Sequence, residues 1–165
     1  MEYQIESMSE SDWDQVRSIY LEGIQTGDAT FETDAPSWEK WDAGHLKDCR
    51  LVARDDCAIL GWAALSRVSA RQVYAGVTEV SIYVAAESRG RRIGQALLSA
   101  LIAESERCGI WTLQAGIFPE NRSSISLHLK NGFREVGRRE RLGKMNGIWR
   151  DVVLLERRSN LVGQS

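Results

Sequence analysis

The stretch Thr78-Glu-Val-Ser-Ile-Tyr-Val84, followed after four residues by Arg89-Gly-Arg-Arg-Ile-Gly-Gln95, decides the fold. The first segment favours a strand, because β-branched and aromatic residues dominate it. Behind the second segment, apolar residues recur at helical spacing, at Ile93, Leu97, Leu98, Leu101 and Ile102. The order of strand, loop and helix predicts free backbone amides at a helix N-terminus, an arrangement that binds anions.

The loop itself favours a diphosphate as the ligand. Gly90 and Gly94 let a phosphate approach the main chain, while Arg89, Arg91 and Arg92 offer charge-assisted hydrogen bonds. The spacing of a P-loop and the dinucleotide pattern Gly-x-Gly-x-x-Gly are both absent from this stretch. An arginine-rich helix start is also typical of a solvated surface, and the loop alone leaves both interpretations open.

Upstream of this unit, periodicity and turn residues predict a strand, two helices and a hairpin. We expect a strand over residues 3–8 and a helix over 9–25 that begins at a cap formed by Ser9 and Asp12. Residues 26–36 form a polar loop that contains one aromatic, Phe31. A short helix over 37–47 and strands over 51–54 and 58–65, joined at Asp55-Asp56, complete this half.

Downstream, the pattern predicts a strand over residues 111–117 and a helix that ends near Lys130, capped by Asn121 or Ser123. Two closing strands are expected over 133–136 and 149–156. The length of 165 residues fits one domain, which we place at residues 1–158, and the polar tail over 159–165 is expected to fray.

Composition excludes several classes of protein. The formal net charge of −2 argues against a nucleic-acid partner held by bulk charge. Cys49, Cys57 and Cys108 lack Cys-x-x-Cys spacing, so we expect neither a disulfide framework nor a metal site. The first residues lack the pattern of a leader peptide and no apolar run is long enough to span a bilayer, so we expect a cytoplasmic protein with no membrane partner.

Taken together, Ser81-Ile-Tyr-Val84 and Arg89-Gly-Arg-Arg-Ile-Gly94 resemble the acetyl-CoA motif of the GNAT superfamily of N-acetyltransferases, Arg/Gln-x-x-Gly-x-Gly/Ala. The resemblance implies acetyl-CoA as co-substrate and no metal. It also implies that the main chain of Ile82, Tyr83 and Val84 pairs with the pantetheine arm, with the Val84 amide at the acetyl oxygen. The pyrophosphate would then be held by Arg89 and the stretch Gly90, Arg91, Arg92, Ile93, Gly94 and Gln95. Arg92 replaces the usual glycine, and we expect it to have the negative φ of a first helical turn.

A second segment, Asn121-Arg-Ser-Ser124 followed by a helix and Gly132-Phe133, is similar to the later motif of the same superfamily. Alone, it is typical of an ordinary capped helix that ends at a glycine. With the first motif, it implies that Asn121 and Ser124 contact the cofactor. The implied fold is α/β (α+β), a mixed, mostly antiparallel twisted sheet of about six to seven strands flanked by about four helices.

Within the superfamily, the chain resembles the branch of phosphinothricin and methionine sulfoximine acetyltransferases. The matching stretches are Gly27-Asp-Ala-Thr-Phe31-Glu32-Thr33, Arg71-Gln-Val-Tyr74, Glu79-Val-Ser81-Ile-Tyr-Val84 and Gly147-Ile-Trp149-Arg-Asp151. This resemblance implies a small amino-acid-like acceptor and a homodimer. The acceptor would be bound by Phe31, Glu32, Ser69, Arg71, Tyr74, Glu79 and Ser81, with Trp62 and Trp149 as further candidates for pocket walls.

The acceptor chemistry gives these residues roles. An amino acid presents a carboxylate, best met by an arginine, and Arg71 is the candidate. Glu79, on the same strand face as Ser81, is the candidate general base for the amine. His128 stands where many members of the superfamily carry an acidic tyrosine, so it is the candidate general acid. A protein or peptide acetyltransferase, and an acyl-CoA-binding module without turnover, remain alternatives.

Overall fold

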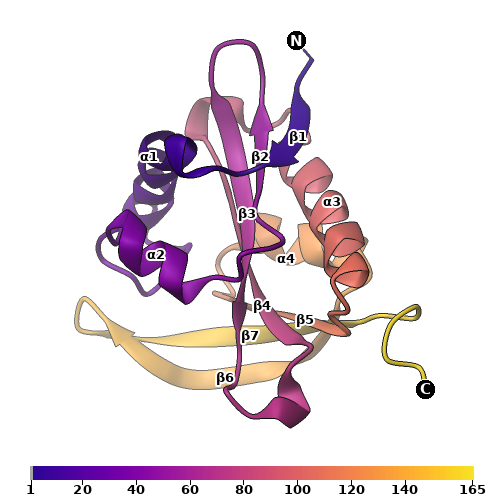
Figure 1. Cartoon of the computed structure of the whole chain (residues 1–165). Helices are drawn as coiled ribbons and strands as arrows, with labels where there is room; N and C mark the ends of the chain where they lie inside the picture. The colour runs from indigo at the N-terminus through magenta and orange to yellow at the C-terminus, as the bar shows by residue number, and fades with distance from the viewer. Residues whose placement is uncertain (1) are drawn as a thin grey trace.

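A computed structural model describes residues 2–165, which form one seven-stranded sheet with helices on both faces (Figure 1). The strands lie in the order β1-β2-β3-β4-β5-β7-β6, and every neighbouring pair is antiparallel except β4 with β5. Their bounds are β1 Gln4–Ser7, β2 Leu51–Arg54, β3 Ile59–Arg67, β4 Val77–Val84, β5 Thr112–Ile117, β6 Arg134–Met145 and β7 Ile148–Arg158. The helices are α1 Trp13–Gln25, α2 Trp38–Gly44, α3 Ile93–Arg107 and α4 Arg122–Lys130. The predicted mixed, mostly antiparallel architecture is confirmed.

The sheet separates two apolar clusters. On one face α3 buries Leu97, Leu98 and Leu101 against the central strands, as its helical periodicity predicts. On the other face α1 and α2 cover a cluster that contains Trp41 and Trp62. β4 is the middle strand of the sheet, with α1 and α2 on one side and α3 on the other (Figure 1).

The sheet splits between β4 and β5. These two strands pair only from Val77 with Thr112 to Glu79 with Gln114. β4 continues to Val84, where it pairs with β3 alone. The second half of β4 therefore has one edge of its backbone facing a gap instead of a neighbouring strand.

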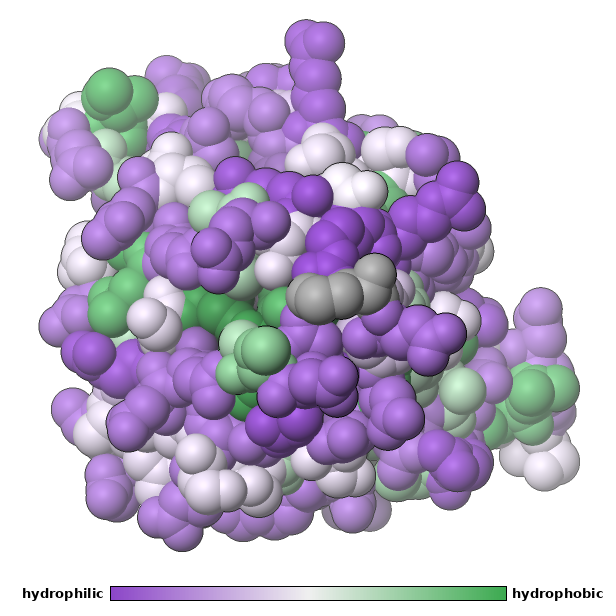
Figure 2. Space-filling view, turned by 90° about the horizontal axis from the view of Figure 1, so that it is seen from above, coloured by the Kyte–Doolittle hydropathy of each residue, from purple (hydrophilic) through white to green (hydrophobic). Residues whose placement is uncertain are grey.

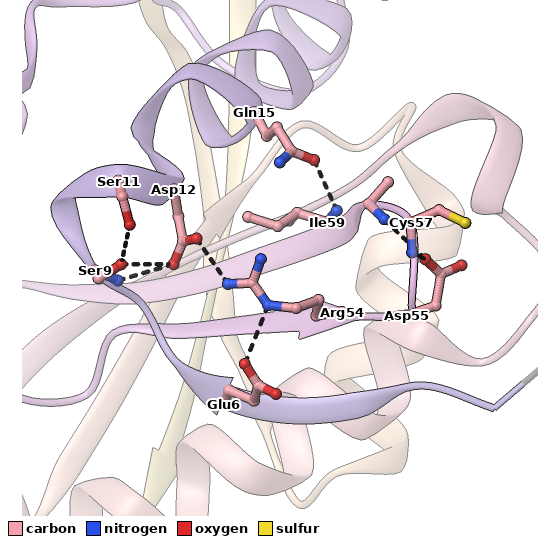
Figure 3. Close-up of polar contacts among 10 residues, drawn as sticks. Glu6, Ser9, Ser11, Asp12, Gln15, Arg54, Asp55, Cys57 and Ile59 are labelled. Atoms are coloured by element: carbon pink, nitrogen blue, oxygen red, sulfur yellow. Dashed lines mark hydrogen bonds and ion pairs between the residues drawn. The ribbon is translucent and has the colours of Figure 1, made fainter.

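An ionic cluster holds the start of α1 against the sheet edge. Figure 3 shows Arg54 of β2 between two carboxylates, with Nη2 at 2.7 Å from Asp12 Oδ1 and Nε at 3.1 Å from Glu6 Oε2. The backbone amide of Ser9 also donates to Asp12, at 2.9 Å, so the predicted cap is formed. Burial alone would raise the pKa of Asp12, but the hydrogen bonds from Arg54 and Ser9 and the charge of Arg54 outweigh it and lower the pKa.

The C-terminal hairpin is longer than expected. β6 runs to Met145 and β7 begins at Ile148, whereas the apolar pattern predicts strands over only 133–136 and 149–156. The turn between them has positive φ at Asn146 and Gly147, 50° and 80°, the pattern of a type I′ turn. Most of β6 is solvent-exposed and polar, so it lacks the alternation that reveals a half-buried strand.

The C-terminal tail is also more ordered than expected. Ser159 is buried, and its hydroxyl donates to Glu106 and accepts from the amides of Leu161 and Val162. Arg158 donates to the carbonyls of Val162 and Gly163. The expected fraying is therefore wrong for these residues, because hydrogen bonds fold the tail back on the end of β7.

The surface seen from above is predominantly hydrophilic, with hydrophobic residues in small separate patches (Figure 2). None of the helices within residues 2–165 combines the length and apolar character needed to cross a membrane.

Candidate active site

A cavity of about 1090 Å³ lies beside the gap in the sheet, between the second half of β4 and the N-termini of α3 and α4. It is lined by eleven of the twelve residues predicted to bind the cofactor, and the exception is Arg91. The eleven are Ile82, Tyr83, Val84, Arg89, Gly90, Arg92, Ile93, Gly94, Gln95, Asn121 and Ser124. The two sequence motifs, 26 residues apart at their nearest ends, therefore converge on one cavity.

The loop before α3 contains left-handed residues of the kind that form an anion nest. Gly90 and Arg92 have positive φ, 80° and 60°, whereas Arg89 before them is extended, at φ −63° and ψ 152°. Arg92 is the N-cap of α3, so the first amides of the helix follow it directly. Left-handed residues that alternate with others turn successive amides toward one point, where a helix N-terminus adds positive potential.

The expected negative φ of Arg92 is wrong. The residue lies one position before the first helical turn and adopts the left-handed conformation at φ 60° and ψ 23°. Glycine enters this region without penalty, whereas other residues are disfavoured by about 1–2 kcal/mol. An arginine here therefore retains its charge beside the cavity at the expense of backbone strain.

The gap presents backbone groups of β4 to the same cavity. The Ala85 amide donates to the Leu60 carbonyl on β3. Because the backbone groups of alternate residues in a strand point to opposite sides, this bond fixes the direction of the groups that precede it. The amides and carbonyls of Tyr83 thus face β3, and those of Ile82 and Val84 face the gap. An extended ligand with amide groups can pair with them as a strand would.

The N-terminus of α4 and the loop over residues 26–32 close the other side. Asn121 accepts from the Ser124 amide and donates to the Asp28 carbonyl, each at 3.3 Å. Arg150 of β7 donates to the Gly27 carbonyl and to the Asp28 carboxylate, each at 2.9 Å. These contacts hold the loop at the rim of the cavity.

A second cavity, of about 480 Å³, meets the first at Ala29, Ile82, Tyr83, Asn121 and Ser124. Its walls contain four of the residues predicted to bind the acceptor, namely Phe31, Glu32, Glu79 and Ser81. Glu79 and Ser81 face it together, as the period of a strand requires. We refer to it as the acceptor cavity.

Glu79 is half-buried at the point where β4 and β5 separate. Burial raises the pKa of its carboxyl group. No hydrogen bond or ion pair to the Glu79 carboxylate is found within the described chain, so its oxygens are open to a ligand in the acceptor cavity. A carboxylate of raised basicity is suited to accept a proton.

His128 is buried on α4 and also lines the acceptor cavity. Its Nδ1 lies 2.7 Å from the Ser124 carbonyl, which can only accept, so Nδ1 carries the proton. Burial lowers the pKa of His128, although the hydrogen bond to Ser124 acts in the opposite sense. The neutral ring thus has an unprotonated Nε2, which is buried and has no hydrogen-bond partner among residues 2–165. It can accept a proton, and it can serve as the predicted acid only after it has done so.

Of the three aromatic residues predicted to wall the acceptor pocket, only Phe31 lines the acceptor cavity. Phe31 packs edge-on against Phe118, with ring centroids 4.8 Å apart, and lines the acceptor cavity. Trp62 is only 1% exposed and belongs to the core under α1 and α2, so its expected role as a pocket wall is wrong. Trp149 lies outside the lining residues, exposed on β7 beside Lys144.

The remaining acceptor candidates lie elsewhere in this chain. Ser69, Arg71 and Tyr74 occupy the connection between β3 and β4, outside the residues that line either cavity. The guanidinium of Arg71 rests over the Tyr74 ring at 5.4 Å. The arginine that does line the acceptor cavity is Arg139 of β6, which the sequence pattern left in an unassigned stretch. Residues 2–165 contain no group of three or more His, Cys, Asp or Glu side chains placed to hold a metal ion.

Comparisons with known proteins agree with this geometry. A sequence model of the acetyltransferase (GNAT) family matches residues 11–133. A phosphinothricin N-acetyltransferase of Alcaligenes faecalis is 33% identical over 152 residues, 88% of this chain and 77% of that protein. An L-methionine sulfoximine/L-methionine sulfone acetyltransferase of Salmonella typhimurium is 31% identical over 106 residues, 64% of this chain and 62% of that protein. The crystal structure of a GNAT superfamily phosphinothricin acetyltransferase from Sinorhizobium meliloti in complex with AcCoA superposes with a TM-score of 0.88 at 29% identity, covering 100% of this chain and 92% of that one.

Proposed function

The chain belongs to the acetyltransferase (GNAT) family, and from that premise we propose that it transfers an acetyl group from acetyl-CoA to the amino group of a small amino-acid-like molecule. One observation carries the proposal. The cavity of about 1090 Å³, proposed to bind acetyl-CoA, meets the acceptor cavity at the split between β4 and β5. Glu79 lies at that split, and its carboxyl group has a raised pKa.

The residues present fit the donor. The nest at Gly90 and Arg92 suits the diphosphate of coenzyme A, and the outward groups of Ile82 and Val84 suit the amides of its pantetheine arm. The Val84 amide is then the candidate donor to the acetyl oxygen. Bound acetyl-CoA supplies the thioester that the amine attacks.

Glu79 and His128 provide a route for protons. An ammonium group first loses one proton, and the neutral amine then forms a bond to the acetyl carbon while the carbon–sulfur bond breaks. The nitrogen loses a second proton as the amide forms, and the released thiolate takes up one proton. The Glu79 carboxylate and the His128 side chain line the same cavity, and the Nε2 of His128 is a buried atom without a hydrogen-bond partner among residues 2–165. We propose that Glu79 deprotonates the amine and that His128, once protonated, returns a proton to the thiolate.

The names of the relatives support the class of acceptor. Phosphinothricin, methionine sulfoximine and methionine sulfone are amino acids with a compact polar side chain, and the acceptor cavity is of matching small size. Phe31, Glu32 and Ser81 are proposed to contact such an acceptor. Ser69, Arg71 and Tyr74 stay predictions from the branch resemblance, and Arg71→Ala should then raise the acceptor KM far more than that of acetyl-CoA.

A homodimer is proposed as well. The branch resemblance implies it, and the hairpin of β6 and β7 exposes Ile148 and Trp149 at 65% and 55%. In this proposal, at least one of these exposed apolar side chains lies at the contact between the two subunits. Light scattering on wild type and on Ile148→Glu tests this, with a fall to the mass of one chain expected for the variant.

Release of free thiol from acetyl-CoA, measured with a panel of acceptors, tests the function. We expect turnover with methionine sulfone, methionine sulfoximine or phosphinothricin. Activity on peptides alone would instead favour a protein acetyltransferase. A rise in melting temperature with acetyl-CoA, without thiol release from any acceptor, would favour an acyl-CoA-binding module.

A further inference from the structure

We propose that Arg139 binds the carboxylate of the acceptor and thereby selects amino acids over simple amines, an assignment that rests on the proposed function. Arg139 lies on β6, at the opposite end of the acceptor cavity from Glu79. The resemblance to known acetyltransferases points to Arg71 for this task, whereas the cavity itself contains a different arginine.

The register of the sheet places Arg139 and Glu79 on one face. Glu79 pairs with Gln114 and Gln114 with Glu156, so these side chains share a face. Val152, four residues before Glu156 on β7, is on that face too and pairs with Arg139. Both ends of this series line the acceptor cavity.

The separation suits a molecule with two charged ends. Three strand spacings across the sheet, about 14 Å, and four residues along it, about 13 Å, place the backbones of Glu79 and Arg139 about 19 Å apart. Long side chains reach inward from both, yet no ion pair joins Arg139 to Glu79 in the described part of the chain. An α-amino acid fits between them, with its amine at Glu79 and its carboxylate at Arg139.

The charge pattern supports the same orientation. Among the described residues that line the acceptor cavity, Arg139 is the only lysine or arginine. Its guanidinium makes no hydrogen bond or ion pair within residues 2–165, whereas that of its neighbour Arg138 binds Asp151 at 2.7 Å. A planar guanidinium without a partner is suited to bind a carboxylate with two parallel hydrogen bonds.

The test compares an acceptor that has a carboxylate with one that lacks it. Methionine sulfone and its carboxamide are assayed with wild type, Arg139→Gln and Arg139→Lys. For Arg139→Gln we expect the KM of methionine sulfone to rise by about 10- to 100-fold, with little change for the carboxamide and for acetyl-CoA. Arg139→Lys should bind methionine sulfone better than Arg139→Gln does, because lysine keeps the positive charge but cannot donate two parallel hydrogen bonds to a carboxylate.

Arg138→Gln is the matched control, since it removes a neighbouring arginine that is already paired. Its ratio of the two KM values should equal that of wild type. Calorimetric titration of methionine sulfone into each variant saturated with coenzyme A gives a readout independent of turnover.

An unchanged ratio of the two KM values in Arg139→Gln, with wild-type enzyme active, would overturn the proposal. If only Arg71→Ala raised the KM of methionine sulfone relative to that of its carboxamide, the role would belong to Arg71. If wild type acetylates neither compound nor any acceptor of the panel, it is the proposed function that fails.

Discussion

The carboxylate of Glu79 faces Gly116 across the split sheet: a Cβ placed on Gly116 would come within 3.6 Å of Glu79 Oε1. The same Cβ would lie 3.3 Å from Val152 Cγ1. Glycine at this position therefore keeps open the space through which the acceptor cavity reaches the carboxylate. The half-buried position that makes Glu79 a better base also carries a penalty for its charge, and both effects are measurable.

Glu79→Gln should lower kcat by about 10²- to 10⁴-fold, because glutamine cannot accept a proton. In wild type, kcat/KM should rise with pH as Glu79 ionises, through a pKa above the ordinary range for glutamate. Steady-state rates across pH check this. An identical profile in the variant would remove Glu79 as the base.

The same substitution should stabilise the fold. A folded-state pKa that is raised above the unfolded value gives stability that is present at low pH and lost as pH rises through the folded pKa. At neutral pH the ionised carboxylate therefore opposes folding, and Glu79→Gln should melt a few degrees higher than wild type. The difference should vanish below about pH 3, where wild-type Glu79 is protonated in both states.

His128→Asn and His128→Gln separate the two ring nitrogens. The asparagine amide can donate to the Ser124 carbonyl in place of Nδ1, whereas neither variant supplies the basic Nε2. We expect His128→Asn to fold, with kcat reduced and the KM of acetyl-CoA little changed. His128→Gln should lose more stability, because its longer side chain does not match the bond to Ser124. Wild-type kcat in His128→Asn would contradict a role in proton transfer.

Gly143→Ala should weaken acceptor binding by moving Phe31. An added Cβ would lie 2.8 Å from Phe31 Cζ, so the ring must shift. Gly137→Ala on the same strand is the control, because its Cβ would meet no atom within 4 Å. The acceptor KM should rise only in the first variant, with that of acetyl-CoA unchanged in both.

Arg92→Gly and Arg92→Val test the left-handed backbone before α3. Glycine relieves strain of about 1–2 kcal/mol but adds chain entropy to the unfolded state, so the net change should lie within about 1 kcal/mol. Valine tolerates this conformation poorly and should lower the free energy of unfolding by about 1–3 kcal/mol. Urea denaturation gives both values; equal stability of the two variants would speak against the positive φ.

Asp12→Asn should destabilise the fold by about 1–3 kcal/mol at neutral pH, because it removes the charged partner of Arg54 (Figure 3). The pKa of Asp12 is lowered, so its contribution is present above the unfolded pKa and is lost as pH falls through the folded one. The gap between wild type and variant should be constant above about pH 5 and narrow in acid. Denaturation at a series of pH values checks this.

The elements with strong periodicity or caps could be predicted from the sequence. Helix α3 is predicted by the spacing of Leu97, Leu98 and Leu101, because one face of that helix is fully buried. The extent of β6 could not be read in this way, since a strand exposed along most of its length carries no apolar alternation. The dipeptide Asn146-Gly147, a hairpin signature, was the signal available for it.

The same difference divides the site. The predicted cofactor motif is local, so most of the residues that line the larger cavity on β4 and α3 could be named from their order along the chain. Arg139 reaches the acceptor cavity only through the pairing of four strands, which no short motif encodes. The backbone angle of Arg92 was hidden for another reason, because the start of a helix is uncertain by a residue and the angle changes sign there.

The separation of β4 from β5 after Glu79 leaves main-chain groups of β4 open, and the proposed binding of acetyl-CoA uses these groups. Main-chain groups are retained in almost any amino-acid replacement, so substitutions along β4 should preserve this proposed binding of acetyl-CoA. The acceptor, by contrast, meets side chains drawn from separate segments, each of which one codon can alter. A lineage can therefore change what it acetylates while it continues to draw on the same metabolic source of acetyl groups.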